Sequence, residues 1–319
     1  MALGEFDLIR RHFTRPVRRA VLGVGDDCAL LALAPGMQLA TSTDMLVEGR
    51  HFLSTVDPAC LGHKALAVNL SDLAACGARP IAFTLALALP QADDDFLAGF
   101  ARGLFALAET HGCELVGGDT TRGPLNLCIT AFGEVPAGGA LLRSGARAGD
   151  TVWVSGTLGD ARLALEVFRG SVALRGEDFN QVRRAMEQPQ PRVALGEALR
   201  GLAGSAIDLS DGLLGDLGHI LAASGVGACI DVDAIPRSAV LAAQTPAWQH
   251  TCTLAGGDDY ELLFTAPATA DVQVRDAGRR AGIAVTAIGR IEAEPGLRLV
   301  DARGAPVESA LRAFDHFRA

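Results

Sequence analysis

The chain has 319 residues, 49% of them hydrophobic and 20% charged, so it can bury a large core and is long enough for two domains. Its formal net charge of −9 argues against a basic nucleic-acid-binding surface. The N-terminus resembles no signal peptide and no apolar run is long enough to cross a membrane, so we expect a cytoplasmic protein without a membrane partner.

Two residue types restrict the chemistry further. The seven cysteines are widely spaced, odd in number and without a C-x-x-C pair, which argues against a disulfide framework or a zinc site. Lys64 is the only lysine, so neither a P-loop nor the strand lysine of a protein kinase is present. A protein of this composition that handles polyphosphates must rely on divalent cations, arginine and backbone amides.

Hydrophobic spacing predicts the elements of the first half in order. A short amphipathic helix over residues 3–13 is followed by strands over 21–24 and 39–43 and by a long helix from 58 to about 77. The remaining elements are a strand over 81–89, a helix capped by Asp93–Asp95 and ended by Gly112, and strands over 115–116 and 125–135.

The second half mixes strands and helices without regular alternation. The predicted strands are 151–154, 206–207, 228–232, 283–288 and 297–300, and the predicted helices are 193–199, 213–223 and 272–281. Residues 175–190 are polar and either helical or irregular. We therefore predict an α+β fold with two domains, residues 1–145 and residues 146–319.

Acidic or hydroxyl-acidic clusters recur where these apolar elements end. Leu115-Val116 is expected to finish a buried strand, after which Gly117 and Gly118 turn the backbone toward a ligand. The clusters are Gly25–Asp27, Ser42–Asp44, Asn69–Asp72, Gly117–Gly123, Asp208–Gly212 and Gly256–Asp259. Carboxylates and hydroxyls so placed are typical ligands of hard cations such as Mg²⁺.

Two phosphorylated ligands in one site would need such cations. Two unit charges about 4 Å apart repel by roughly 4 kcal/mol at an effective dielectric constant near 20. Phosphoryl transfer then depends mainly on positioning and charge neutralisation. No Ser-His-Asp or Cys-His pattern indicates a covalent catalytic residue.

The clusters, taken in order, closely resemble the thiamine-monophosphate kinase family. The resemblance extends from Gly4-Glu5-Phe6 to Phe314-Asp315-His316-Phe317, and its most specific runs are Gly23–Ala29, Lys64–Ala74, Gly117–Gly123 and Ile207–Gly212. It implies ATP-dependent phosphorylation of thiamine monophosphate to thiamine diphosphate, with several Mg²⁺ ions. It also implies the two-domain PurM-like fold of aminoimidazole-ribonucleotide synthetases, as a homodimer formed through N-terminal sheets.

The resemblance also implies roles for individual residues. The positions that match magnesium ligands are Asp27, Ser42, Thr43, Asp44, Asp72, Asp119, Asp208 and Asp211. The positions that match ATP contacts are Gly118, Asp119, Arg143 and Ser210, and those that match substrate contacts are His51, Asp258 and Phe314. At Asp258 the related sequences carry glutamate, so the carboxylate here is one methylene shorter.

Each role has a structural alternative. Ser210 is also suited to cap the helix predicted at 213–223, Arg143 to form a surface ion pair, and Phe314 to pack in a core. Asp26 fits a turn, and Trp248 and Tyr260 are interpreted as packing residues.

The activity has alternatives as well. The nearest is another ATP-using enzyme of the same superfamily, such as a purine-synthesis cyclo-ligase, a selenophosphate synthetase or a hydrogenase-maturation factor. A selenophosphate synthetase would have a reactive cysteine and a lysine in an N-terminal glycine-rich loop, and the maturation factor would end in cysteine. A non-catalytic Mg²⁺-nucleotide-binding module would bind ATP without turnover.

Overall fold

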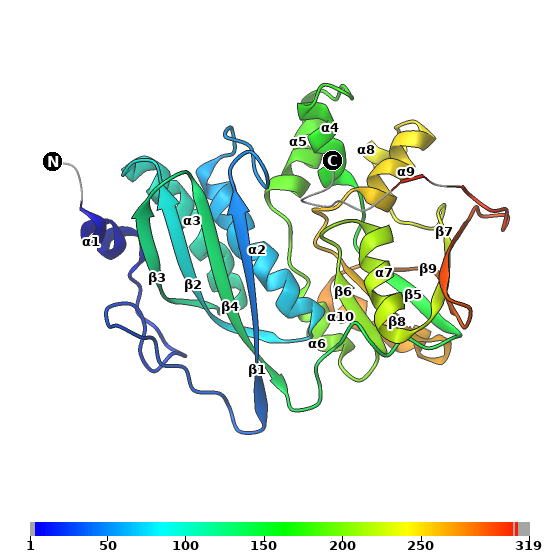
Figure 1. Ribbon diagram of the computed structural model, residues 1–319, viewed down its shortest axis with the longest axis horizontal. Coiled ribbons are helices and arrows are strands. Elements are labelled where there is room, and N and C mark those ends of the chain that lie inside the picture. The colour runs from blue at the N-terminus through cyan, green and yellow to red at the C-terminus, as the bar shows by residue number, and fades with distance from the viewer. Residues whose placement is uncertain (1–3, 309, 312–319) are drawn as a thin grey trace. The chain divides into compact units, whose positions relative to one another are not determined.

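The structure is a computed structural model, and it describes residues 4–308, 310 and 311. The chain divides into two compact units. Unit 1 contains the residues up to Leu73 together with Ala78–Gly138, and unit 2 contains Ala74–Gly77 and the residues from Gly139 onward. The predicted α+β class with two domains is confirmed (Figure 1). Among the described residues, no helix is both long and apolar enough to span a membrane.

Unit 1 is built on a four-stranded sheet in the order β1-β4-β2-β3. Its strands are β1 (Met37–Val47), β2 (Arg79–Leu89), β3 (Glu114–Arg122) and β4 (Asn126–Pro136). β4 is antiparallel to both β1 and β2, whereas β2 and β3 are parallel. The two edge strands are therefore β1 and β3.

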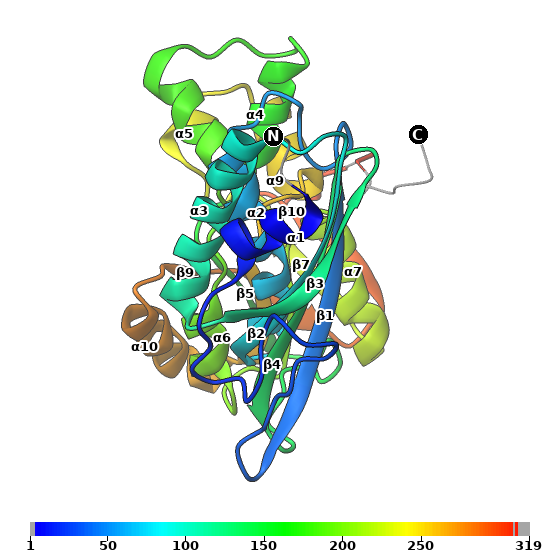
Figure 2. The same cartoon turned by 90° about the vertical axis from the view of Figure 1, so that its left-hand side faces the viewer.

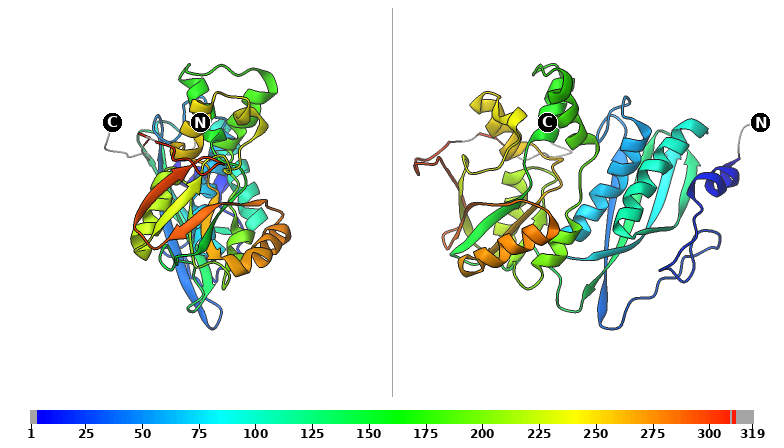
Figure 3. Two further views of the ribbon diagram at one scale, coloured as in Figure 1. Left: turned by 90° about the vertical axis from the view of Figure 1, so that its right-hand side faces the viewer. Right: turned by 180° about the vertical axis from the view of Figure 1, so that it is seen from behind.

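Two long helices, α2 (Pro58–Ala75) and α3 (Asp94–His111), cover one face of this sheet (Figures 2 and 3). α2 is apolar on almost every side, and Leu61, Leu66 and Leu70 are fully buried. Glycine lets the two helices approach closely, because a Cβ at Gly103 would lie 1.8 Å from the carbonyl oxygen of Ala59. We call the face of the sheet under α2 and α3 the helix face, and the other the open face.

The N-terminal segment begins with helix α1 (Glu5–Leu8) and the π-helical turn η1 (Ile9–Phe13), as the apolar spacing predicted. The predicted strand over 21–24 is wrong. Only isolated bridges form there, between Leu22 and Leu30 and between Val24 and Asp26. The segment folds back on itself, so its apolar residues pack against Ile81, Ala82 and Val116 without joining the sheet.

The strand predicted to end at Val116 is also longer than expected. β3 continues through Gly117-Gly118 to Arg122. A register shift opposite Phe83 and Thr84 takes up the irregularity, and Gly118 has a φ of +150°. Any side chain at Gly118 would collide with Leu85, since a Cβ there would lie 1.9 Å from the Leu85 carbonyl oxygen. Gly118 therefore permits close strand packing, and the two glycines do not form the predicted turn.

Unit 2 contains a six-stranded sheet in the order β10-β7-β9-β5-β8-β6. The strands are β5 (Asp150–Ser155), β6 (Ser205–Asp208), β7 (Gly227–Asp231), β8 (Leu262–Pro267), β9 (Val285–Glu292) and β10 (Gly296–Val300). Only β10 and β7 are parallel. The order mixes early and late strands, which explains why no regular alternation is visible in the sequence.

The helices of unit 2 fall into three groups. Helix α7 (Leu213–Ser224) belongs to the main core through Leu213, Leu217 and Ile220. A second apolar cluster is formed by residues of α4 (Asp160–Phe168), α5 (Gly176–Glu187), α8 (Ala239–Ala242) and α9 (Pro246–Ala255). Helix α6 (Val193–Leu199) packs against α10 (Asp271–Ala281), which follows the short 3-10 turn η2 (Ala268–Ala270).

Candidate functional site

Unit 1 brings three of the predicted cation ligands together beside α2. Ser42 and Asp44 project from β1 toward the helix face, and the Ser42 hydroxyl donates a hydrogen bond to the Asp72 carboxylate on α2. The backbone amide of Asp44 donates to Asn69 Oδ1 at 3.1 Å. We call Ser42, Asp44 and Asp72 the α2 acidic cluster.

The surroundings of Asp44 in this cluster raise its pKa. Burial, the nearby Asp72 charge and a hydrogen bond with Asp72 raise the pKa of Asp44 to about 7, from an ordinary value of 3.8. Two carboxylates in a partly desolvated site favour a shared proton or a bound cation. Their hard oxygen atoms and the Ser42 hydroxyl fit Mg²⁺.

The cluster alone falls short of a complete metal site. In residues 4–308, 310 and 311, no three His, Cys, Asp or Glu side chains are grouped so as to hold a metal ion. Thr43 points the other way from its neighbours on β1 and shares a hydroxyl hydrogen bond of 2.9 Å with Thr130. Any cation at Asp44 and Asp72 therefore needs further ligands.

His51 is held just beyond the end of β1. Its Nδ1 accepts a hydrogen bond from the amide of Val47 at 3.0 Å, so a proton on the neutral ring sits on Nε2. Lys64, which is buried in α2, donates from Nζ to the His51 carbonyl oxygen at 3.3 Å. The lysine fixes the backbone of a predicted substrate-contacting residue, a role that the sequence analysis did not assign.

Asp119 lies apart from the α2 acidic cluster. It belongs to β3, and its register partner Ala86 is exposed like Asp119 itself. Asp44, in contrast, belongs to β1 at the opposite edge of the sheet. The predicted grouping of Asp44, Asp72 and Asp119 is thus not formed within one chain.

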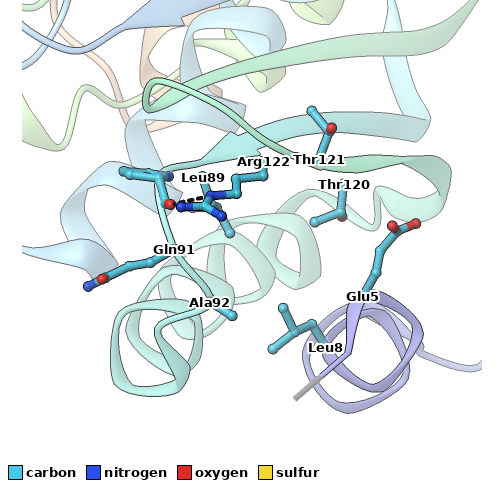
Figure 4. A pocket seen from close by; sticks show the side chains of 9 residues that line it. Glu5, Leu8, Leu89, Gln91, Ala92, Thr120, Thr121 and Arg122 are labelled. Carbon is cyan, nitrogen blue, oxygen red and sulfur yellow. Dashed lines mark hydrogen bonds between the residues drawn. The ribbon is translucent and has the colours of Figure 1, made fainter. Parts of the chain in front are cut away.

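A pocket of about 410 Å³ beside the end of β3 confirms which way these side chains point (Figure 4). Thr120 and Thr121 both line it together with Leu8 and Glu5 of α1, and the Thr121 side chain points away from α1. Arg122 donates from Nε to the Pro90 carbonyl oxygen at 3.3 Å across its rim. Since side chains alternate along a strand, Asp119 shares the open face with Thr121.

Asp27 lies in the exposed loop between the bridged residues Leu22 and Leu30. Its amide donates to Asp26 Oδ1 at 2.8 Å, which agrees with the interpretation of Asp26 as a turn residue. The apolar neighbours of this loop pack on the sheet through Ile81 and Val116. The loop is therefore anchored near the starts of β2 and β3.

Unit 2 has its own group of predicted ligands, at the end of β6. Asp208 is buried, and the loop Leu209–Gly212 leads from it into α7. This loop is paired with the segment Gly256–Glu261: the amides of Asp258 and Tyr260 donate to the carbonyls of Ser210 and Leu209, each at 2.8 Å. The two acidic motifs, far apart in sequence, thus form one structure.

Asp216 orders the loop before α7. One oxygen of its buried carboxylate accepts hydrogen bonds from the amides of Ser210, Asp211 and Gly212, each at 3.1 Å. The predicted helix cap at Ser210 is wrong, since the cap residue is Gly212 and its side chain makes no capping bond. A carboxylate one turn into the helix accepts from the amides of the preceding loop instead.

Asp258 and Tyr260 have left-handed backbones, with φ of +63° and +50°. Such conformations are strained for residues with side chains and persist where neighbouring contacts enforce them. Tyr260, interpreted as a packing residue, also donates from its hydroxyl to Asp258 Oδ1 at 3.0 Å. The Asp258 carboxylate is therefore held by its own neighbour.

An ion pair fixes the end of this segment. Arg192 donates through Nε to Glu261 at 2.7 Å and through a second nitrogen to the other carboxylate oxygen. Ser155 also donates to the buried Glu261, and it accepts from the amide of Leu262. Glu261 was visible in the sequence as part of the acidic run, but nothing local connected it to Arg192.

Asp259 is a half-buried acid of the same run. Burial raises its pKa well above the ordinary value, and its Oδ1 accepts a hydrogen bond from the Gly159 amide at 2.8 Å. Gly159 is the N-cap residue of α4. Asp259 therefore has a structural role at a helix start.

Two predicted contacts remain to be located. Arg143 is exposed, and the amide of Ala206 in β6 donates to the carbonyl of its neighbour Leu142 at 2.8 Å. Arg143 thus follows a segment paired with the strand that ends in Asp208. Phe314 lies outside the described residues.

Comparisons with known proteins all point to one family. The sequence matches the family described as AIR synthase related protein, through its N-terminal domain over residues 25–135 and its C-terminal domain over residues 147–302. It is 47% identical to thiamine-monophosphate kinase of Salmonella typhimurium, with 99% of both chains covered.

Solved structures of similar fold belong to the same group of proteins. The crystal structure of thiamine-monophosphate kinase from Stenotrophomonas maltophilia is 44% identical, with a TM-score of 0.87 and coverage of 96% of this chain and 99% of that one. A structure described as AaThiL complexed with AMPPCP and TMP is 30% identical, with a TM-score of 0.77 and coverage of 90% and 89%.

Proposed function

Because the chain belongs to the thiamine-monophosphate kinase family, we propose that it transfers the γ-phosphoryl group of ATP directly to thiamine monophosphate, giving thiamine diphosphate and ADP. The observation that supports this most strongly is the α2 acidic cluster. Two carboxylates and a hydroxyl stand at the end of an apolar helix, and the pKa of Asp44 is raised to about 7. A site of this kind is suited to a cation that accompanies phosphates.

The residues of unit 1 have distinct parts in this proposal. Asp44 and Asp72 bind Mg²⁺ with Ser42, Thr43, Asp27 and Asp119, and Gly118 and Asp119 contact ATP. The Ser42 hydroxyl orients Asp72, while Asn69 fixes the backbone at Asp44. His51 contacts thiamine monophosphate, with Lys64 holding its backbone in place.

Unit 2 supplies the remaining predicted contacts. We propose that Asp208 and Asp211 bind Mg²⁺, that Arg143 and Ser210 contact ATP, and that Asp258 and Phe314 contact thiamine monophosphate. Arg143 carries positive charge toward phosphate oxygens, which suits a chain with one lysine. The amides held by Asp216 and the Glu261–Arg192 pair keep this loop in one arrangement.

The chain itself needs little acid–base chemistry. Mg²⁺ held by the carboxylates would neutralise the charge that develops on the phosphates during transfer. The acceptor phosphate is already ionised near neutral pH, so no strong general base is required. No residue forms a covalent intermediate in this scheme, and the residues act by positioning and by charge.

We also propose a homodimer, formed through residues 1–145, which bind ATP and Mg²⁺ as well, while residues 146–319 form the second domain. Neither nucleic acid nor a membrane is a partner. A cytoplasmic location fits the seven free cysteines, because thiols persist in reducing compartments.

The direct test is to incubate the purified chain with ATP and thiamine monophosphate and to measure ADP and thiamine diphosphate by mass spectrometry. We expect the two products in equal amounts, with turnover lost on chelation of Mg²⁺ and restored when Mg²⁺ is returned. A reaction without thiamine monophosphate controls for ATP hydrolysis.

Two outcomes would contradict the proposal. ADP without thiamine diphosphate would indicate another substrate, and the superfamily alternatives would then be assayed with their own substrates. ATP binding without turnover would indicate a non-catalytic nucleotide-binding module.

A further inference from the structure

The segment that leads to Asp27 is held to the sheet of unit 1 by one carboxylate. Glu114, the first residue of β3, accepts hydrogen bonds from the amide of Arg18 at 2.6 Å, that of Arg19 at 3.0 Å and that of Ala20 at 3.1 Å. Successive backbone amides that converge in this way form a site for an anion. In this protein the anion is supplied by the chain itself.

The contact is electrostatic as well as geometric. Although desolvation raises the pKa of Glu114, the amides of residues 18–20 and the Arg19 charge lower it below its ordinary value of 4.5, so the group is a carboxylate at neutral pH. The Arg19 side chain adds a second attachment. It donates to the Pro80 carbonyl oxygen at 2.8 Å and to the buried Glu134 carboxylate at 3.3 Å. Residues 18–20 are therefore fixed through both backbone and side chain.

The loop with Asp27 starts directly after Ala20, and we call residues 21–30 the Asp27 loop. Its two arms are joined where the amide of Leu30 donates to the carbonyl of Leu22 at 3.0 Å. Ala29 in the second arm packs on buried residues of β2 and β3. The tip with Asp27 is exposed. The position of an exposed tip depends on its arms, and Glu114 anchors the chain that leads into the first of them.

We propose, resting on the proposed kinase function, that Glu114 is a positioning residue for Mg²⁺ binding, because it fixes the loop that presents Asp27. In this scheme Glu114 contacts neither substrate nor Mg²⁺ and acts only through Asp27. Its strand, β3, also carries Asp119, another proposed ligand. One strand thus sets the position of Asp119 through the chain and that of the Asp27 loop through hydrogen bonds.

Removing the anchor should weaken Mg²⁺ binding more than it slows the chemistry. Glu114→Ala deprives three amides of their acceptor. If the Asp27 loop then occupies its ligating position about one tenth of the time, the apparent Mg²⁺ affinity falls about tenfold. We expect the Mg²⁺ concentration for half-maximal turnover to rise about tenfold, with kcat at saturating Mg²⁺ within about twofold of wild type. A loss of stability alone would lower Tm and leave the Mg²⁺ requirement unchanged.

Two further variants keep the test independent of how well Glu114→Ala folds. Glu114→Gln keeps one acceptor oxygen but turns donor hydrogens toward the remaining amides, so we expect a rise of about threefold in the Mg²⁺ requirement. Glu109→Ala is the matched control, because Glu109 is an exposed acid on α3 in the same unit. It should behave like wild type, and thermal unfolding checks that every variant is folded.

A double variant shows whether Glu114 acts through Asp27. Asp27→Asn damages the proposed ligand itself, so its kcat should remain low even at saturating Mg²⁺. Adding Glu114→Ala to Asp27→Asn should change the Mg²⁺ requirement no further, since the loop then has no ligand to position. A further rise in the double variant would overturn the proposal.

Hydrogen exchange of backbone amides measures the anchor without turnover. We expect the amides of residues 18–20 and of Leu30 to exchange at least about tenfold faster in Glu114→Ala than in wild type, with no change in Glu109→Ala. Unchanged protection over residues 18–30 in Glu114→Ala would overturn the proposal.

Mn²⁺ binding separates this proposal from the proposed function. Electron paramagnetic resonance measures the affinity for Mn²⁺ in place of Mg²⁺, and we expect it to fall about tenfold in Glu114→Ala. If wild type lacks kinase activity, the proposed function fails, whereas Mn²⁺ affinity and hydrogen exchange still decide the role of Glu114. Faster exchange with unchanged Mn²⁺ affinity would show that Glu114 is structural only and would contradict the positioning role.

Discussion

Two aspartates, half-buried Asp44 in unit 1 and buried Asp216 in unit 2, show the same pKa shift in different surroundings. The pKa of Asp44 and that of Asp216 are both raised to about 7, chiefly by burial. Asp44 has another carboxylate, Asp72, as its neighbour, and that neighbour raises its pKa further. Asp216 has three backbone amides on one oxygen, and they lower its pKa against the effects of burial and of the Asp211 charge.

The difference in neighbours distinguishes a carboxylate suited to bind a cation from one that has a structural role. Around Asp216 the protein supplies three backbone amides, so its carboxylate oxygen stabilises the loop as a hydrogen-bond acceptor. Around Asp44 the protein adds a second carboxylate, an arrangement that suits a bound cation. A raised pKa alone does not distinguish the two cases, whereas the identity of the neighbours does.

The largest expected effect is on turnover at the α2 acidic cluster. Asp44→Asn removes one charge from the proposed cation site, and we expect kcat to fall by at least about 10²–10³-fold, as when a group that stabilises transition-state charge is lost. The measurement is steady-state formation of thiamine diphosphate. Asp276→Asn is the control, because Asp276 pairs with Arg279 on an exposed surface.

The same variant is expected to remain folded, with an unchanged far-ultraviolet circular dichroism spectrum. Near-normal turnover of Asp44→Asn would show that Asp44 binds no essential cation.

At Asp216 the acceptor oxygen should matter more than the charge. Asp216→Ala leaves three amides without their acceptor, and we expect the free energy of unfolding to fall by about 3 kcal/mol. Asp216→Asn keeps an oxygen in place, so we expect a loss of less than about 1 kcal/mol. Urea denaturation measures both.

Measuring kcat separates the role of Asp216 from that of Asp44. Asp216→Asn is expected to keep kcat within a few fold, unlike Asp44→Asn, because only the position of the loop is at stake. Equal losses of stability in Asp216→Ala and Asp216→Asn would show that the negative charge holds the loop.

The pH dependence of stability follows from the direction of the two shifts. Each folded carboxyl binds its proton more tightly than in the unfolded chain, where the ordinary value is 3.8. The stability linked to these protons is fully present below about pH 4 and is lost as the pH rises through about 7. Without metal, we expect unfolding free energy to fall by about 1–3 kcal/mol over this window.

Chemical denaturation at several pH values, with and without Mg²⁺, measures this effect. Mg²⁺ should restore stability at pH 8 in wild type, and Asp44→Asn should show a smaller decline without metal. A decline that is identical in wild type and Asp44→Asn would assign the effect to other groups.

The smallest effect is expected where the sequence departs from its relatives. Asp258→Glu lengthens the carboxylate by one methylene and disturbs its hydrogen bond with Tyr260. We expect KM for thiamine monophosphate to change by less than about threefold, because the charge is kept. Asp258→Asn is the comparison variant, and a larger effect of glutamate than of asparagine would indicate that reach outweighs charge.

Sequence signals within a few residues were sufficient to predict most of the helices and strands. The apolar spacing of α2, the Asp93 cap and Gly112 stop of α3, and the runs that became β2 and β4 are set by neighbours within a few residues. Local signals failed at residues 21–24, where a short apolar run packs on the sheet without pairing, and at Gly117-Gly118, where glycines serve close packing within β3.

The sequence by itself determined which chemistry is present: clustered carboxylates, a single lysine and the motifs of one family. Only the tertiary structure decided which groups meet, because strand pairing joins residues far apart in the chain. It placed Asp72 beside Ser42 and Asp44, Arg192 on Glu261, and Asp216 under three amides. It also set β1 and β3 at opposite edges of the sheet, which separates Asp44 from Asp119.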